Sequence, residues 1–412
     1  MGTNGNARLF WTYWSASTVS SVGTAVTTVA LPLVAVAVLH ASALAVGALA
    51  ASTYVAWLVI GLPAGVIVGH LPLRATQVAM DLLRALALAS VPLAWWLGRL
   101  SMAQLVVVAL VVSFANVLFQ VGNMTLLPAI VPKEQLSSRN SFMSGTFATT
   151  QLGGPSLGGL LVQLFGAVPT LLADSVSYLV SALLMGSLPP RHQARPEART
   201  STGAMIAEGW RFVSRHPVMA PCMWMATVVN LACGALMALA PLYLVRVLHA
   251  PAALVGVLLA TEGVGTLLGA TLTPRLNRRL GTARALLLAG LVGALLALLM
   301  PAGSGPVGML LFGLGNAGFA GGVVVLSINT RTHRQTESPP EMLARVMATV
   351  RFVSWGAIPI GALAAGAVAG AWGPRAALWL TSALTFVPLA ILWASPVRGR
   401  RELEETAGVL AA

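Results

Sequence analysis

Glu262 is an acidic residue near the middle of a long apolar stretch of the chain. A charge buried in a membrane costs at least a few kcal/mol, so such a residue needs a specific role. At about 100° per residue, its helical face holds small and polar residues: Thr266, Gly269 and Thr273. Apolar residues turn away from that face: Val257, Val264 and Leu268. The carboxyl would then point toward protein or a cavity and could carry a proton, although a neutral or ion-paired packing residue would give the same pattern.

Asp174 is a second acidic residue inside an apolar stretch. Polar residues share its helical face over about three turns: Thr170, Ser177, Tyr178 and Ser181. This stripe could line a water-filled path, or it could bond one helix to its neighbours. We therefore treat Asp174 as the second candidate for proton coupling. Asp81 and Arg84, three residues apart, are expected to pair with each other or with a loop.

Arg351 and three tryptophans are candidates for substrate contact or for an inner gate. Arg351 lies about two helical turns into an apolar stretch, where it could bind an anion or snorkel to the membrane surface. Trp57, Trp224 and Trp355 lie deep in apolar stretches. They could stack on a flat or amphipathic substrate, or they could simply pack against lipid and neighbouring helices.

The residue inventory excludes several catalytic chemistries. A phosphate-cradling loop needs Gly followed by Lys and Ser or Thr, and the only lysine, Lys133, lies between Pro132 and Glu134. The six histidines show no paired metal spacing. No Gly-x-Ser-x-Gly elbow has a plausible partner histidine. We therefore expect no enzyme activity, ATP site, metal or cofactor.

The amino-acid composition indicates an integral membrane protein. Of 412 residues, 57% are hydrophobic and 8% are charged, whereas soluble domains carry about 25% charged residues. The mean hydropathy is +0.84. Apolar runs long enough to cross a bilayer predict an all-α fold with twelve transmembrane helices. These lie near 9–38, 44–69, 76–98, 102–130, 137–165, 167–187, 218–247, 252–274, 282–301, 306–330, 342–370 and 374–395.

The net charge of +13 follows from topology rather than from nucleic-acid binding. Of 24 basic residues, three fall on the outer side when the N-terminus is inside: Arg99, Arg246 and Arg375. This positive-inside bias predicts that both termini are cytoplasmic. The Ala- and Arg-rich, Lys-poor usage suggests a GC-rich bacterial genome, and we expect the protein in the plasma (inner) membrane of a bacterium.

The spans form two halves that resemble each other. Arg74 corresponds to Arg279, and Pro155 to Pro359, with similar offsets. We expect an N-terminal six-helix bundle over 1–188, a cytoplasmic linker over 189–216, a C-terminal six-helix bundle over 217–396 and a cytoplasmic tail over 397–412. In the linker, residues from Glu208 onward predict an amphipathic helix on the inner membrane face. Duplicated halves predict a binding site near the midplane, where the halves meet.

Several motifs resemble the major facilitator superfamily of transporters over nearly the whole chain. Residues Gly65 to Arg74 match the family's Gly-rich, basic loop signature. A second copy of the signature runs from Gly269 to Arg279 and includes Arg275 and Arg278. Gly154-Pro155-Ser-Leu-Gly158-Gly159 is similar to the signature of the family's antiporters. Asp81-Leu-Leu-Arg84 is similar to sequences of the branch that holds enterobactin-type and macrolide exporters. Two departures concern coupling: Gly69-His70 replaces the usual Asp-Arg, and Gln120 and Asn123 stand in the span where drug–proton antiporters often have Arg.

The resemblance implies a secondary transporter with two pseudo-symmetric bundles that works by alternating access. We expect proton-driven efflux of a small amphipathic compound, such as an antibiotic or other secondary metabolite. An alternative within transport is siderophore export, where Arg351 would favour an anionic substrate. An alternative of another class is a transporter-like sensor or scaffold without coupled flux. The expected partners are a small-molecule substrate, protons and membrane lipid, with the protein acting as a monomer.

Overall fold

The structure is a computed structural model of the whole chain, and it describes residues 3–61, 63–64, 67–68, 71–189 and 202–403. These residues are nearly all helical, and no strand occurs among them. The helices are α1 (Thr3–Leu33, continued by a π-helical turn over Val34–Val38), α2 (Ala43–Ile60), α4 (Leu73–Trp96), α5 (Met102–Ile130), α6 (Lys133–Phe165), α7 (Ala167–Gly186), α8 (Thr202–Arg215), α9 (Met219–Arg246), α10 (Ala252–Leu280), α11 (Thr282–Ala297), α12 (Gly305–Glu337), α13 (Pro340–Trp372), α14 (Pro374–Leu384) and α15 (Phe386–Trp393).

The all-α membrane fold predicted from the sequence is confirmed. Among the described residues, 10 helices are long and apolar enough to cross a membrane, with α14 and α15 together forming one of them. The other two predicted spans, 137–165 and 282–301, fall on α6 and on the shorter apolar helix α11. The second predicted span reached residue 69, but α2 ends at Ile60. Gly61 is the residue that caps the end of α2, and Pro63 lies two residues further along the chain.

Glycines in the left-handed region reverse the chain at three helix connections. Gly166 joins α6 to α7 with φ +87°, Gly281 joins α10 to α11 with φ +86°, and Gly373 joins α13 to α14 with φ +84°. Only glycine adopts this backbone without steric cost. Gly166 and Gly373 follow the fifth and eleventh predicted spans, so equivalent turns recur at equivalent places in the two halves.

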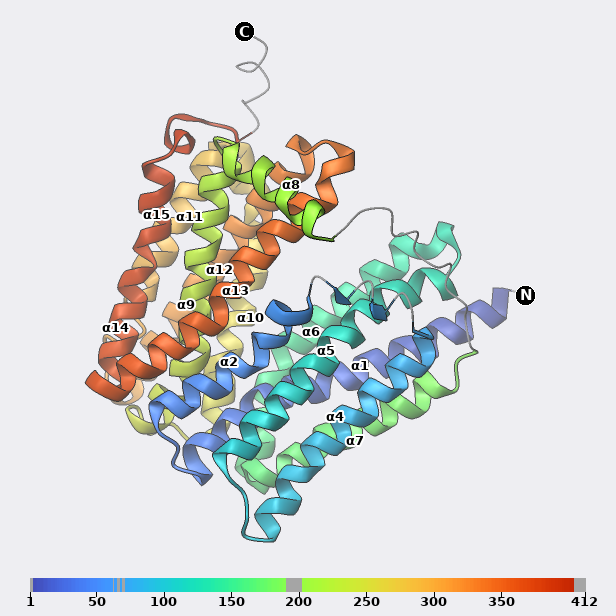
Figure 1. Cartoon of the computed structure of the whole chain (residues 1–412). Coiled ribbons are helices and arrows are strands. Elements are labelled where there is room, and N and C mark those ends of the chain that lie inside the picture. The colour runs from blue at the N-terminus through green and yellow to red at the C-terminus, as the bar shows by residue number, and fades with distance from the viewer. Residues whose placement is uncertain (1–2, 62, 65–66, 69–70, 190–201, 404–412) are drawn as a thin grey trace. The chain divides into compact units, whose positions relative to one another are not determined.

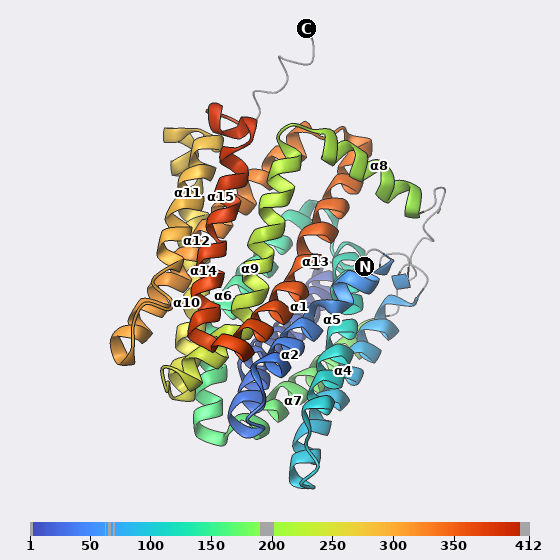
Figure 2. The ribbon, with the colours of Figure 1, turned by 60° about the vertical axis from the view of Figure 1, so that its left-hand side comes forward.

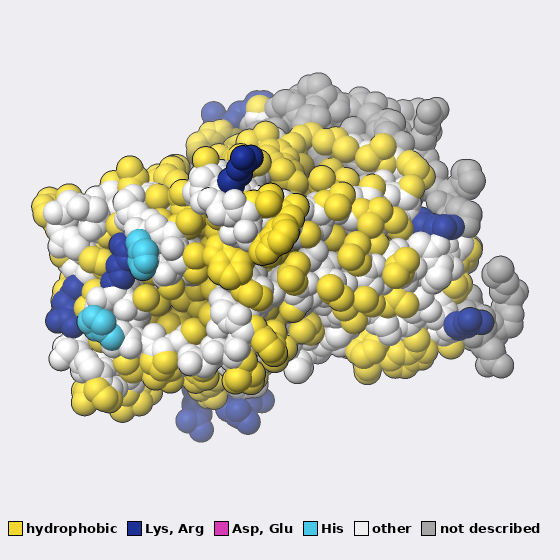
Figure 3. Space-filling model, turned by 90° about the horizontal axis from the view of Figure 1, so that it is seen from below, with side chains coloured by type: hydrophobic (Ala, Val, Ile, Leu, Met, Phe, Trp, Pro, Cys, Tyr) yellow, Lys and Arg dark blue, Asp and Glu magenta, His cyan; other side chains and the backbone are white. Residues whose placement is uncertain are grey.

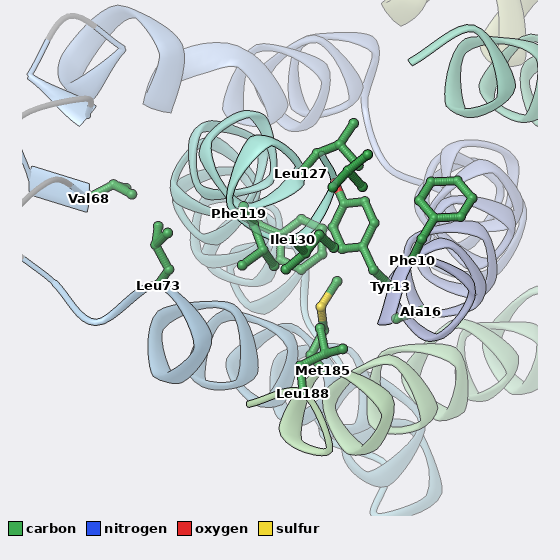
Figure 4. Close-up of a cluster of buried hydrophobic side chains, with 12 residues drawn as sticks. Phe10, Tyr13, Ala16, Val68, Leu73, Phe119, Leu127, Ile130, Met185 and Leu188 are labelled. Carbon is green, nitrogen blue, oxygen red and sulfur yellow. The ribbon is translucent and has the colours of Figure 1, made fainter. Parts of the chain in front are cut away.

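The described chain divides into two compact units. Unit 1 contains residues 1–198 and 250–260, and unit 2 contains residues 199–249 and 261–412. In unit 1, α4 and α7 run side by side with α1 next to them (Figure 1). A buried core joins α1, α4, α5 and α7, and it includes Tyr13, Phe119, Leu127 and Met185 (Figure 4). One member of this core, Phe119, also contacts the polar network described below.

Unit 2 is organised around the pair α9 and α13, which lie side by side in both ribbon views (Figures 1 and 2). A Cβ at Gly234 of α9 would collide with the Ile358 carbonyl of α13, and a Cβ at Gly361 of α13 would collide with the Leu231 carbonyl. The two backbones therefore approach each other closely because these positions lack side chains.

The linker helix α8 packs on α13 of the same unit. Its Gly209 and Val213 are buried, whereas Trp210 and Arg211 are exposed, which is the two-faced pattern of an amphipathic helix. Glu208 pairs with Arg345 of α13. Helix α8 therefore has one buried and one exposed face and is held against α13 of unit 2.

The surface carries the apolar side chains that a lipid-facing protein requires. Hydrophobic side chains cover most of the face drawn in Figure 3. Large apolar residues are widely exposed; Leu183, for example, is 75% exposed. A water-soluble monomer rarely exposes apolar patches on this scale.

The close approach of α9 to α13 predicts that Gly234→Ala lowers the free energy of unfolding by about 1–3 kcal/mol, because the added methyl group meets backbone that cannot move aside. Gly370→Ala is the matched control, since a Cβ there meets nothing within 4 Å. Thermal unfolding of the detergent-purified protein checks both variants. Equal stability of the two variants would contradict this packing.

Candidate functional site

A buried ion pair lies inside unit 1. Asp81 and Arg84, both on α4, form a salt bridge, and their side chains are 0% and 2% exposed. Ser181 of α7 donates a hydrogen bond to Asp81 Oδ2 at 2.7 Å. The expectation that Asp81 and Arg84 pair is thus met by direct contact, and α7 adds a third partner.

Arg84 makes three further contacts that join α4 to α5 and α7. Its Nη1 donates to Asn116 Oδ1 of α5 at 2.6 Å. Its guanidinium lies over the Phe119 ring at 4.1 Å and over the Tyr178 ring at 4.2 Å. Stacking between two aromatic faces and pairing with a carboxylate suits the planar, weakly hydrated guanidinium group. A buried charge is therefore neutralised within the helix bundle.

The network continues to α1 through α7. The Tyr178 hydroxyl is hydrogen-bonded to Thr24 Oγ1 at 2.9 Å. A Cβ at Gly23 would collide with the side chains of Ser177 and Asp174. Glycine at this position thus lets α1 close directly over the two polar groups of α7.

Asp174 is completely buried in this network. Its Oδ1 accepts a hydrogen bond from Ser177 Oγ at 2.9 Å. Its Oδ2 is also buried but forms no hydrogen bond of normal geometry within the described part of the chain, although Thr27 of α1 lies near the carboxyl. Arg84 lies within electrostatic range of Asp174. The stripe on α7 therefore bonds helices together and holds an incompletely satisfied carboxyl.

Glu262 has a different environment from the other two intramembrane acids. Its side chain is exposed, and it has no hydrogen bond or ion pair with any residue that the structure describes. It lies ten residues into α10 (Ala252–Leu280), and Cys233 of α9 is within electrostatic range. The Glu262 side chain is thus exposed and has no counter-charge bonded to it among the described residues.

The exposed residues of α10 fall on two sides of the helix. Val257, Val264 and Leu268 are exposed and lie about 120–160° around the helix from Glu262. Thr266, one turn beyond Glu262, is exposed on the same side as the carboxyl. One exposed side of α10 is therefore apolar, as lipid contact requires, and the other is polar.

Helix α12 packs against α10 beside this polar side. Gly269 of α10 approaches the Gly321 carbonyl of α12 so closely that a Cβ would collide with it. Asn316 of α12 donates to Thr261 Oγ1 at 3.1 Å. Thr273, the last member of the predicted polar face, is buried. Part of that face thus packs against protein, and Glu262 and Thr266 remain accessible.

Arg351 and Trp355 of α13 lie together. The Arg351 guanidinium is 4.2 Å from the centre of the Trp355 ring, one turn further along the helix. Trp224 of α9 is 47% exposed and makes an edge contact with Trp210 of α8, with ring centres 6.4 Å apart. Among the predicted substrate or gate residues of unit 2, Arg351 thus contacts Trp355, and Trp224 contacts Trp210.

The remaining substrate candidates belong to unit 1. Trp57 is half-buried on α2, and it packs against a small apolar core of α2 and α5. Gln120 is exposed on α5. The backbone carbonyl of Asn123 accepts a hydrogen bond from Tyr13 at 3.3 Å. Among these three, Gln120 has the most accessible side chain.

The antiporter-like segment of α6 is a packing surface within unit 1. Gly154 and Gly158 face α1, and a Cβ at Gly158 would lie 3.0 Å from the Val26 carbonyl. A Cβ at Gly159 would lie 2.7 Å from the Ala252 carbonyl at the start of α10. Helix α6 continues through Pro155 to Phe165. These small residues bring α6 against both α1 and the first part of α10.

The loop signatures are only partly described. Gly65 and the Gly69-His70 departure lie outside the described residues, and Arg74 is half-buried in the first turn of α4. In the second copy, Arg275, Arg278 and Arg279 are exposed at the end of α10. Within the described part of the chain, no group of three or more His, Cys, Asp or Glu residues could hold a metal ion.

Two parts of the network were not identified from the sequence. Asn116 holds Arg84, and Gly23 permits the closure of α1 over Asp174. A signal for α1 was present, because Ser17, Ser20, Thr24 and Thr27 recur every three or four residues in an otherwise apolar helix. No comparable pattern marks Asn116.

The buried ion pair predicts that Arg84→Met lowers the free energy of unfolding by about 3–5 kcal/mol, because Asp81 would be left buried without its counter-charge. The double variant Asp81→Leu/Arg84→Met should regain part of that loss. Thermal unfolding of the single and double variants in detergent measures the coupling. A double variant that loses the sum of the single losses would show that the pair is not coupled.

Comparison with known proteins agrees with this architecture. The family described as transmembrane secretion effector matches residues 6–408. The chain is 27% identical over 376 residues to the multidrug efflux pump Tap of Mycolicibacterium fortuitum, covering 88% of this chain and 89% of the pump. It is 28% identical over 358 residues to Tap of Mycobacterium tuberculosis, covering 83% of this chain and 81% of that protein.

Solved structures of transporters share the fold. The nucleoside transporter NupG matches with a TM-score of 0.75 at 14% identity, covering 94% of this chain and 98% of NupG. A bacterial homologue of the iron transporter ferroportin matches with a TM-score of 0.70 at 16% identity, covering 96% and 99% of the two chains. The protein is thus a bacterial-type, multi-pass membrane transporter rather than an enzyme, and it belongs to the transmembrane secretion effector family of the major facilitator superfamily.

Proposed function

We propose that this protein is a proton-driven exporter of small amphipathic compounds that works by alternating access. The observation that carries the proposal is the accessible, unpaired carboxyl of Glu262 within a membrane-spanning helix. An uncompensated charge at such a position is costly and is retained where it serves an ion or substrate pathway. We infer that water reaches this exposed side chain, which would let it load and release a proton.

Asp174 is the second candidate for proton coupling. It is enclosed by α1 and α7 and can exchange a proton only if these helices separate. The side chain of Glu262 is exposed and is not enclosed in this way. We therefore assign the transported proton to Glu262, and we assign to Asp174 the role of holding α1 against α7.

The substrate class rests on aromatic and charged side chains and on the relatives. Trp224, Arg351 and Gln120 are exposed, and aromatic rings with a few charges suit amphipathic molecules. The Tap proteins of two mycobacterial species are named multidrug efflux pumps. Export of antibiotics or other secondary metabolites is the activity that these observations favour.

The remaining parts of the proposal concern organisation in the membrane. The positive-inside bias supports an inner-membrane protein with both termini in the cytoplasm. We propose that six-helix bundles over 1–188 and 217–396 rock about a site near the midplane, linked by 189–216 and followed by the tail 397–412. The monomer would be the functional unit, and Gly154, Pro155 and Gly159 would provide a close-packed contact during rocking.

Energised inside-out vesicles test this function through dequenching of an acridine dye, which reports proton release from the vesicle lumen. Macrolides, other antibiotics and siderophores are added in turn. We expect one compound class to dequench the dye in the wild type and none to do so in Glu262→Gln, because the amide cannot carry a proton. Glu337→Gln, at the end of α12, is the matched control and should behave as the wild type.

Other outcomes would replace parts of the proposal. Dequenching that persists in Glu262→Gln but disappears in Asp174→Asn would move the proton to Asp174. A response to siderophores alone, lost in Arg351→Gln, would favour siderophore export. Binding of a compound without any flux would indicate a sensor or scaffold instead of a transporter.

A further inference from the structure

A cluster of basic side chains lies at one end of unit 2, where three segments meet. The end of α12 contributes Arg331, His333 and Arg334. The junction between α8 and α9 contributes His216, and the segment after α15 contributes Arg400. These segments do not include α10, which carries Glu262, and the cluster has no part in the proposed transport step.

His333 is the most unusual member of the cluster. It is 1% exposed, and neither ring nitrogen has a hydrogen-bond partner among the described residues. The His216 ring meets it edge-on with ring centres 5.6 Å apart. Buried polar atoms in native proteins are nearly always hydrogen-bonded, and leaving them unpaired costs stability. The described residues therefore leave both ring nitrogens of His333 without a hydrogen-bond partner.

The charges around His333 are of one sign. Each described group that acts electrostatically on it is basic: His216, Arg334 and Arg400. Arg334 is itself close to the charge of Arg331, and its Nε is buried without a hydrogen-bond partner in the described chain. Like charges held together repel one another unless a counter-ion is present. A negatively charged ligand would therefore be attracted to this cluster.

His216 occupies a fixed position in this cluster. Its Nδ1 accepts hydrogen bonds from the backbone N–H groups of Val218 and Met219 at 3.2 and 3.1 Å. Burial and, to a lesser extent, the charge of Arg400 lower the pKa of His216. The His216 ring is therefore uncharged at neutral pH, and the positive charge of the cluster comes from its arginines.

Arg400 is held in place by the chain on both sides of it. Val397 is 0% exposed and Leu403 is 1% exposed. Glu402 accepts a hydrogen bond from the Thr282 backbone N–H at 2.9 Å, and the Ala283 N–H donates to the Arg401 carbonyl at 3.0 Å. The segment after α15 is therefore docked on the start of α11, which fixes Arg400 beside His216 and His333.

We propose that this cluster binds a phosphate-bearing anion between Arg334, Arg400 and His333. Arginine donates paired hydrogen bonds to phosphate oxygens, and an imidazole N–H adds a further donor. A metal ion would be repelled by the same charges. The phosphate could belong to an anionic phospholipid headgroup, for which basic pockets between membrane helices are typical sites, or it could be free phosphate.

Thermal unfolding of the full-length protein in nanodiscs tests the proposal. Inorganic phosphate is titrated at constant ionic strength, with chloride as the replacement, in phosphatidylcholine discs and in discs that also contain phosphatidylglycerol. A ligand that binds the folded state raises Tm in a saturable way. We expect this rise with phosphate in neutral discs, with phosphatidylglycerol, or with both.

A lipid headgroup and free phosphate, the two sources of the bound phosphate, give different Tm results. If the headgroup occupies the site, phosphatidylglycerol raises Tm and added phosphate has no further effect in those discs. If free phosphate is the ligand, phosphate raises Tm equally in both kinds of disc.

Variants then locate the site. Arg334→Gln and Arg400→Gln should each weaken the response about tenfold or more, the expected effect of losing a charge-assisted hydrogen bond. Arg284→Gln removes an exposed arginine at the start of α11 and should leave the response unchanged. If Arg334→Gln fails to fold, Arg400→Gln, on the segment after α15, provides the comparison.

Two results would overturn the proposal. One is the absence of any Tm rise above the chloride control in both kinds of disc. The other is a rise that Arg284→Gln reduces as much as Arg334→Gln and Arg400→Gln do, since this would indicate general charge screening rather than a site.

Discussion

The exclusion of water from the hydrocarbon core is the constraint on which this structure depends. Each backbone group within a span must find its partner inside the chain, and a charge that lacks a partner there is costly. Helices meet the backbone requirement, and the described residues are accordingly almost all helical. Arg84 shows how a charge is accommodated, through one carboxylate, one amide and two aromatic rings on three helices. The network around Arg84 therefore determines where α4, α5 and α7 lie in unit 1.

The same constraint explains what the sequence could predict. The spans follow from runs of apolar residues, and the pairing of Asp81 with Arg84 follows from a spacing of three on one helix. The end of α2 at Ile60 was less predictable, because the apolar run of the sequence continues past this residue. Asn116 and Gly23 depend on which helices become neighbours, and residues so far apart in sequence carry no local sign of their contact.

The candidate site shows a similar division. The sequence identifies Asp174 and Glu262 as acids within spans, and helical periodicity correctly separates Glu262 from the apolar side of α10. The sequence does not distinguish the environment of Asp174 from that of Glu262. Asp174 is sealed by α1 because Gly23 has no side chain, whereas Glu262 is accessible and unpaired. Two carboxyls that the sequence places within apolar stretches therefore acquire different proposed roles, one in helix packing and one in proton transfer.

The most direct test of this account is the uptake or release of protons when a compound binds to the purified protein in weakly buffered detergent solution. The compound is the member of the transport panel that most raises Tm, and a pH indicator records the change. If substrate displaces the proton held by Glu262, the wild type releases a proton on binding and Glu262→Gln releases none while still binding. Equal proton release by the wild type and Glu262→Gln would contradict the assignment of the transported proton to Glu262.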